Sequence, residues 1–312
     1  MVCLCLKNKG SAVRFCLWPP MSKKYLMVTS NFDNWKQDFF KNYMSPRNKE
    51  YAKIHDFEYL EFLDVKEKYR EHPSWLKFKL ISNLLQEEKI KNGDVITQID
   101  ADMCIAKTGF NYVTNKSFSY SIDSANSHCM GHFSLRINDW SRNLVRLILD
   151  EDRYKKLQNH ITEHEYFGFS NSFVMDFREQ ASWYYLAGIK RHSQKSFWKY
   201  PNYGWHSEVT EFTEFSIEEL HENVEILPTQ WNVTEVRGES VCKFLINKSN
   251  YKDTIIRHFA GGQPWRKEWF ENETPKRLEI INLKLFFKSY IPKIKPKTLK
   301  KIKTILKKLL NI

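Results

Sequence analysis

Two aspartates, Asp100 and Asp102, are the residues whose spacing most directly suggests chemistry. They follow the segment 94–99, DVITQI, which predicts a buried strand ending at Asp100. Side chains two residues apart on a strand point the same way, so both carboxylates can reach one cation. Mg²⁺ and Mn²⁺ prefer oxygen ligands and keep positions open for phosphate oxygens. The pair predicts a divalent-metal site for a phosphate-containing ligand; the alternative is a solvated acidic pair.

A second signal lies far downstream, in the segment 257–265, RHFAGGQPW. His258 precedes a pair of glycines that begins at Gly261. Its nitrogen can be a third ligand to the same metal, and the glycines let backbone amides approach a phosphate closely. The alternative is a partly buried histidine followed by a glycine turn, and the spacing alone leaves both interpretations open.

Alternating strand and helix patterns position Asp100. Segments 24–30 and 57–63 predict strands, and 74–90, which follows Pro73, has the apolar spacing of a helix. This alternation predicts an α/β fold with a mostly parallel sheet, and ligands bind at the carboxyl ends of such strands. Further helices are expected over 35–54, with an interruption at Pro46, over 138–158, and at the end of 172–190, after a strand.

The net charge of +12 is concentrated at one end of the chain. Residues 280–312 contain ten lysines and no acid, so residues 1–279 carry a net charge of only +2. A nucleic-acid-binding protein more often spreads basic residues across its working face, and we expect no nucleic-acid partner. The composition divides the chain into a disordered leader over 1–22, a main domain over 23–279 and a lysine-rich tail over 280–312.

The six cysteines contain no CxxC pair and suit neither a zinc site nor a disulfide framework. No apolar run reaches the length of a transmembrane helix. These features predict a cytoplasmic protein in a reducing compartment.

Four segments together resemble one known family. Segment 48–59, NKEYAKIHDFEY, resembles its N-x-x-Y-A-x-x-H-G-Y/F opening, and 75–77, WLK, resembles its W-x-K helix. Segment 94–102 resembles its strand with Asp-x-Asp, and 258–264, HFAGGQP, resembles its H-F-x-G-x-K-P. The family is the galactosyl/xylosyl/mannosyl transferase group, which includes plant xyloglucan xylosyltransferases and fungal Golgi α-transferases. Glycogenin-like transferases share a similar His-Gly-Lys-Pro ending.

The resemblance spans 24–265 and implies a single Rossmann-like nucleotide-binding glycosyltransferase fold of the GT-A type. It also implies Mn²⁺ or Mg²⁺, a UDP-sugar donor, a glycan or lipid-linked acceptor and retention of anomeric configuration. By position, Asp100 and Asp102 match the metal-binding pair and His258 matches the third ligand. Glu179 and Gln180 match the family's acid and amide that touch the donor sugar. The donor pocket would be lined by Thr29, Ser30, Asp100, Gly261 and Gln263.

The chain departs from the family pattern at three places. Gln263 stands where the family has a phosphate-binding lysine, so that charge is unmet or falls to neighbouring basic residues. Asp56 replaces the glycine after His55, and 168–172 is only a loose echo of the family's Asn-x-Gly segment. These departures bear on the identity of the donor sugar more than on the reaction class.

Two other function classes compete with this interpretation. Phosphatases with an aspartate nucleophile also place Asp-x-Asp after a buried strand. They need Thr or Val where this chain has Cys104, and a later acidic pair that is missing from this sequence. The second alternative is a non-catalytic membrane or nucleic-acid binder that acts through the tail, and the nearly neutral body disfavours it.

The tail predicts an amphipathic C-terminal helix over 298–312. Leu and Ile residues recur there at three- and four-residue spacing, and most lysines fall off that stripe. Such a helix lies on an anionic membrane surface, so we expect a peripherally membrane-associated enzyme. The alternative is a helix that docks its apolar stripe on the domain.

The aromatic segment 197–205 and its flanks suggest either a stacking surface for an acceptor sugar or a packed lid. The residues concerned are His192, Trp198, Tyr203, Trp205 and His206.

Overall fold

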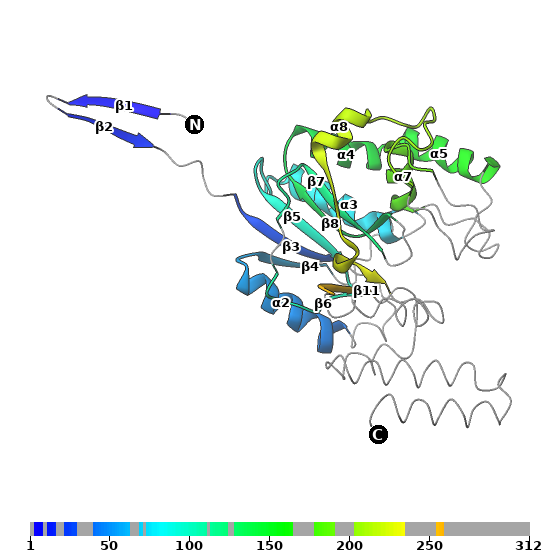
Figure 1. The fold of residues 1–312 in the computed structure, drawn as a ribbon, viewed down its shortest axis with the longest axis horizontal. Coiled ribbons are helices and arrows are strands. Elements are labelled where there is room, and N and C mark those ends of the chain that lie inside the picture. The colour runs from blue at the N-terminus through cyan, green and yellow to red at the C-terminus, as the bar shows by residue number, and fades with distance from the viewer. Residues whose placement is uncertain are drawn as a thin grey trace, which may run out of the picture.

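A six-stranded sheet forms the centre of the molecule, here a computed structural model (Figure 1). The structure describes residues 3–8, 11–16, 22–29, 40–62, 69–70, 73–110, 113–123, 128–164, 178–190, 203–234 and 254–258. In spatial order the strands are β4 (Glu58–Phe62), β3 (Lys24–Thr29), β5 (Val95–Asp100), β8 (His128–Arg136), β7 (Phe118–Ile122) and β9 (Val224–Leu227). All run in one direction except β8, which is antiparallel to both of its neighbours. The predicted α/β class and mostly parallel sheet are confirmed.

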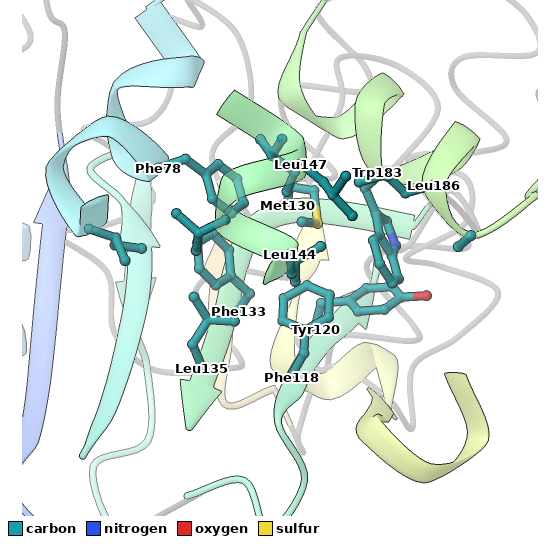
Figure 2. Close-up of a cluster of buried hydrophobic side chains, with 14 of the residues drawn as sticks. Phe78, Phe118, Tyr120, Met130, Phe133, Leu135, Leu144, Leu147, Trp183 and Leu186 are labelled. Carbon is teal, nitrogen blue, oxygen red and sulfur yellow. The ribbon is translucent and has the colours of Figure 1, made fainter. Parts of the chain in front are cut away.

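Layers on both faces explain why the central strands β3, β5, β7 and β8 are buried along almost their whole length. One face is covered by α3 (Leu76–Gln86), α4 (Asp139–Leu149), α5 (Glu151–His164) and α7 (Glu179–Leu186). Figure 2 shows this core, where Phe78 stacks on Phe133 with ring centroids 5.1 Å apart. On β3, Met27 joins this core, whereas Val28 joins a second cluster around α2 (Ser45–Ile54) on the other face.

A smaller sheet crosses the end of β5. Its order is β10 (Val233–Thr234), β11 (Ile256–His258) and β6 (Met103–Ile105), and β6 follows β5 directly in the chain. The antiparallel pairing of β11 with β6 places His258 opposite Met103. Two segments far apart in sequence therefore meet where the aspartate pair lies.

Strand β8 carries a bulge at the same edge. The consecutive β7 residues Tyr120 and Ser121 pair with Phe133 and Cys129, so the β8 residues 130–132 have no β7 partner in register. Bulges bend a strand and re-aim its side chains and backbone groups. This bulge turns the backbone of 130–132 toward α3, α7 and the end of β5.

Two sequence expectations about helices were wrong. Pro46 does not interrupt a helix but lies in the first turn of α2, where its missing N–H costs no hydrogen bond, and a π-helix, η1 (Phe40–Met44), precedes it. The single helix expected over 138–158 is two helices, because Asp150 has an extended ψ of 122° between α4 and α5. Asn138 and Ser141 form a capping box at the start of α4.

Asp56 has a φ of 58°, in the left-handed region. It follows the C-cap His55 of α2, where the family pattern has glycine. Glycine adopts this conformation without steric cost, and aspartate is one of the few other residues that tolerates it. The substitution is thus compatible with the same helix end.

The remaining described elements are peripheral to the site. Within residues 1–22, expected to be a disordered leader, β1 (Cys3–Asn8) pairs with β2 (Ser11–Cys16) in a hairpin that Figure 1 shows extending away from the sheet. The short elements are η2 (Pro73–Trp75), α8 (Ile217–Asn223) and η4 (Thr229–Trp231). No helix in the described part of the chain is long and apolar enough to cross a membrane. The tail at 280–312 lies outside the described residues, and the division into leader, domain and tail stays a prediction.

Candidate functional site

Asp100 ends β5 beside the end of β3, as the sequence predicted. The backbone N–H of Ala101 donates to the carbonyl of Thr29, and Asp100 is the register partner of Thr29 across the sheet. The Gln98 amide donates to Thr29 Oγ1 at 2.8 Å and to Asp100 Oδ1 at 3.0 Å. Thr29 and Asp100, both assigned to the donor pocket, are thus brought together. Ser30, assigned with them, lies outside the described residues.

A buried lysine links Asp100 to the predicted donor-sugar acid. Lys77 Nζ lies 2.7 Å from Asp100 Oδ1 and 3.1 Å from Glu179 Oε1. It also donates to the carbonyl of Met130, in the β8 bulge, at 3.0 Å. The ammonium therefore fixes the ends of β5 and α7 and the bulge relative to one another.

The charges in this buried cluster depend on each other. Burial alone would lower the pKa of Lys77, but Asp100 and Glu179 outweigh burial and raise it well above its usual value. Burial raises the pKa of Asp100, which Lys77 opposes and Asp102 reinforces. Lys77 is a single positive charge among three carboxylates, so additional positive charge, such as a proton on His258, would be stabilised here.

Asp102 and His258 form the other side of the site. Asp102 Oδ1 lies 3.5 Å from His258 Nε2, and the two side chains are 23% and 11% exposed. His258 Nδ1 is 3.1 Å from Asn232 Oδ1, a hydrogen bond in which the ring N–H donates. Burial would lower the pKa of His258, but Asp102, and to a lesser degree Cys129, raise it well above its usual value. Nε2 is therefore held toward the aspartate pair.

Gly131 is closely packed between the two sides. A Cβ at this position would lie 2.7 Å from Met103 Cε, 3.3 Å from Asp100 Oδ2 and 3.4 Å from His258 Cε1. Asp100 Oδ2 and the His258 ring thus both lie close to Gly131, where a side chain would collide with Met103.

The side chains of Asp100, Asp102 and His258 are of the types that bind a hard divalent cation, but the three do not point to a common position. Two carboxylates and one imidazole nitrogen match the ligand chemistry of Mn²⁺ or Mg²⁺. Among the described residues, however, no three such side chains lie close enough to hold an ion as they stand. Asp102 and His258 are adjacent, whereas Asp100 is fastened to Lys77. The fit therefore rests on Asp102 and His258, with Asp100 Oδ2 close to the same place, beside Gly131.

The other predicted site residues fall into three groups. Glu179 is 4% exposed and Gln180 is half-buried, with Oε1 of Gln180 accepting from the backbone N–H of Met130 at 3.2 Å. Gly261 and Gln263 lie outside the described residues. Of the aromatic segment, Tyr203 and Trp205 pack against the core, and Trp205 donates to the Tyr120 hydroxyl at 3.2 Å. The packed interpretation holds for these two, while His192 and Trp198 lie outside the described residues.

Sequence reasoning missed the roles of Lys77 and Gly131. Lys77 was part of the W-x-K segment but was given no role. The available signal was its place at the head of the buried stripe that continues with Ile81 and Leu84 on α3, where a lone lysine needs buried acids. Gly131 carried no local signal, because its neighbours in space come from β5, β6 and β11.

Comparison with known proteins gives structural neighbours only. No protein-family model and no curated protein sequence matches the chain. A solved glycosyltransferase involved in the glycosylation of the major capsid of PBCV-1 is 10% identical, with a TM-score of 0.45 over 80% of this chain and 99% of that chain. The glycosyltransferase GlyE of Streptococcus pneumoniae TIGR4 gives 0.36 at 10% identity over 86% and 58%. The galactosyltransferase LgtC, in complex with donor and acceptor sugar analogs, gives 0.35 at 11% identity over 80% and 94%. Because these TM-scores lie below 0.5, the function proposed below is argued from the geometry of the site.

Proposed function

We propose that this chain is a metal-dependent glycosyltransferase of the GT-A type that moves a sugar from a UDP-sugar donor to a glycan or lipid-linked acceptor. The observation that carries the proposal is the meeting of Asp102 and His258 beside the Lys77–Asp100–Glu179 cluster at the carboxyl end of β5. This is the edge at which α/β sheets bind nucleotides.

Asp102 and His258 would hold the ion, with Asp100 alongside. Mn²⁺ or Mg²⁺ bound there would offset the charge that grows on the nucleoside diphosphate as the sugar bond breaks. Thr29 and Asp100 would form the nucleotide side of the pocket. Lys77 holds Asp100 and Glu179 in fixed positions, so that little reorganisation is needed when the donor binds.

Glu179 and Gln180 would orient the donor sugar from the start of α7. Glu179 is held by Lys77, and Gln180 is held through Oε1 by the β8 bulge. Retention of anomeric configuration rests on the family resemblance. An NMR spectrum of the product's anomeric proton tests it, and an inverted linkage would show that this part of the proposal is wrong.

The decisive experiment is a donor screen. UDP-galactose, UDP-glucose, UDP-xylose and UDP-N-acetylglucosamine are incubated with the full chain, with Mn²⁺ or with EDTA, and UDP release is measured. We expect metal-dependent release from at least one donor. Phosphate release from p-nitrophenyl phosphate, with no release of UDP from any donor, would instead support the aspartate-nucleophile phosphatase.

Membrane association belongs to the same proposal. It rests on the apolar stripe of 298–312 and the lysines beside it, outside the described residues, and it places the enzyme on a cytoplasmic anionic surface close to a lipid-linked acceptor. Sedimentation with anionic and neutral liposomes should separate the full chain from one that ends at Glu279. Equal binding by both chains would show that the tail is not the anchor.

A further inference from the structure

A pocket of about 780 Å³ opens between the end of α4, one face of α5 and the turn 210–214, away from the aspartate pair. This volume is within the range of small-molecule sites. Its α5 residues recur at positions 152, 153, 156, 159 and 160, one polar stripe beside the buried stripe of Tyr154, Leu157 and Ile161. The residues that line the pocket include Arg153, Lys156, Asn159, His160, Glu211 and Phe212.

Arg153 makes this pocket a fixed structure. Its side chain is 9% exposed, and Nη1 lies 2.7 Å from Glu214 Oε1. Nη2 donates to the carbonyl of Phe212, and the backbone N–H donates to Asp150 Oδ1 at 2.8 Å. The backbone N–H of Glu214 donates in turn to the carbonyl of Leu186 on α7. The turn, α5 and α7 are therefore joined through a single buried guanidinium and its partners.

Two rings of the lining, His160 and Phe212, form an aromatic wall, and the buried Tyr185 packs behind them. The His160 ring lies 5.0 Å from the Phe212 ring and 5.6 Å from the Tyr185 ring, edge-on to the latter. The Tyr185 and Phe212 rings are 5.8 Å apart, also edge-on. Aromatic C–H and ring surfaces with polar groups around them suit a ligand that has both apolar faces and polar edges.

The charge of the lining disfavours anionic ligands. Four carboxylates, those of Asp150, Asp152, Glu211 and Glu214, oppose an anion, and the Arg153 guanidinium is already paired with Glu214. In the part of the chain that the structure describes, no group of three or more His, Cys, Asp or Glu side chains is placed to hold a metal ion. Lys156 donates, Glu211 accepts, and the Asn159 amide does both, which matches hydroxyl groups, because each hydroxyl also donates and accepts.

Helix α7 connects this pocket to the proposed transfer site. Glu179 begins the helix at the Lys77 cluster, and Tyr185, near its end, packs against His160 and Phe212, which line the pocket. With a rise of about 1.5 Å per residue, the two ends are about 10 Å apart. A chain of several sugar units could span this distance.

We propose that this pocket binds a neutral oligosaccharide, as the distal part of the acceptor of the proposed glycosyltransferase. Hydroxyl groups bind the α5 stripe and Glu211, and a sugar face lies toward His160. The identification as acceptor rests on the proposed function; the binding of sugar does not.

The test is binding by the full chain, measured by isothermal titration calorimetry and saturation-transfer NMR. The probes are cellopentaose, maltopentaose, xylopentaose and chitopentaose, with inorganic phosphate, a sulfated tetrasaccharide and spermine as charged competitors. We expect at least one neutral pentasaccharide to bind. Asn159→Trp, which fills the pocket from an exposed position, should weaken its binding about tenfold or more.

Lys155→Trp is the matched control, because Lys155 is exposed on the same helix but does not line the pocket. It should bind like the wild type, and Glu211→Ala should weaken binding from the opposite wall. Asp102→Ala should keep the binding even though it loses transfer, which separates this proposal from the proposed function. Binding by no neutral probe, equal binding by Asn159→Trp, or loss in that variant of phosphate, sulfated-sugar or spermine binding alone would overturn the proposal.

Discussion

Asp100 and Asp102 are separated by one residue but have different electrostatic surroundings. Asp100 faces a permanent cation, the buried ammonium of Lys77 at 2.7 Å, which also holds Glu179. Asp102 faces a histidine that is anchored by Asn232 and lies nearer to solvent. On the Asp100 side the negative charge is balanced by Lys77, whereas the Asp102 side is suited to a metal ion that binds and dissociates. We therefore expect substitutions on the two sides to have different effects.

Removing the permanent cation should have the largest effect. Lys77→Met leaves the buried carboxylates of Asp100 and Glu179 without a partner, which typically costs about 3–5 kcal/mol. We expect the free energy of unfolding in urea to fall by this amount and transfer to be lost. Lys79→Met on the same helix, at a more exposed position, should cost less than about 1 kcal/mol. An equal fall in the free energy of unfolding for the two variants would contradict the conclusion that Lys77 balances the buried carboxylates.

On the Asp102 side, a substitution should reduce activity and leave the free energy of unfolding almost unchanged. Asp102→Ala removes a ligand of the proposed ion from a partly exposed position, so transfer should fall about 10³-fold or more, with unfolding changed by less than about 1 kcal/mol. Asp102→Asn keeps the shape and tests the charge alone. EDTA should abolish wild-type transfer and added Mn²⁺ should restore it. A fully active enzyme in EDTA would refute the metal site.

Gly131 lies between the two sides, and its substitution should cost both stability and activity. In Gly131→Ala the new Cβ meets Met103 Cε at 2.7 Å and borders Asp100 and His258. We expect about 1–3 kcal/mol of destabilisation from overpacking and about 10- to 100-fold slower transfer. Adding Met103→Ala should relieve the destabilisation but not the slow transfer. Gly109→Ala, where nothing lies within 4 Å of the added Cβ, should change neither. If the double variant regained full activity, the close packing of Gly131 against Asp100 and His258 would not matter for transfer.

Local sequence patterns were sufficient to predict the strands and the helix that position Asp100. The strand before Asp100 is rich in β-branched residues, and α3 has a clear helical stripe, so β3, β4, α3 and β5 were all placed correctly. The break at Asp150 was missed because it depends on a single backbone torsion that no periodicity records. Pro46 was taken for an interruption, although proline also fits the first turn of a helix. The α/β class followed from the alternation alone.

The site was predictable only where a motif was contiguous. The pair Asp100 and Asp102 and the distant His258 were assigned from motifs, and the structure places Asp102 beside His258. The partners of Lys77 were not readable, since they come from β5, β8 and α7, and neither was the close packing around Gly131, which lies in a bulge. Such contacts are made by tertiary pairing, and local sequence does not encode them.

The smallest expected effect comes from a second histidine near the same edge, His132, which has no carboxylate to raise its pKa. Burial lowers the pKa of His132 from 6.5 to about 3, and its ring stacks on Trp231 at 5.9 Å. Below pH 6.5 the His132 side chain therefore binds a proton in the unfolded chain but stays neutral in the folded protein. The free energy of unfolding consequently decreases as the pH falls from 6.5 toward 3. At pH 5 this amounts to about 2 kcal/mol relative to pH 7. His132→Phe keeps a ring against Trp231 and removes the titration, so the loss of stability between pH 7 and pH 5 in urea unfolding should be smaller by about this amount than in the wild type. Parallel pH profiles for the two proteins would show that His132 is protonated, or solvated, in the folded state.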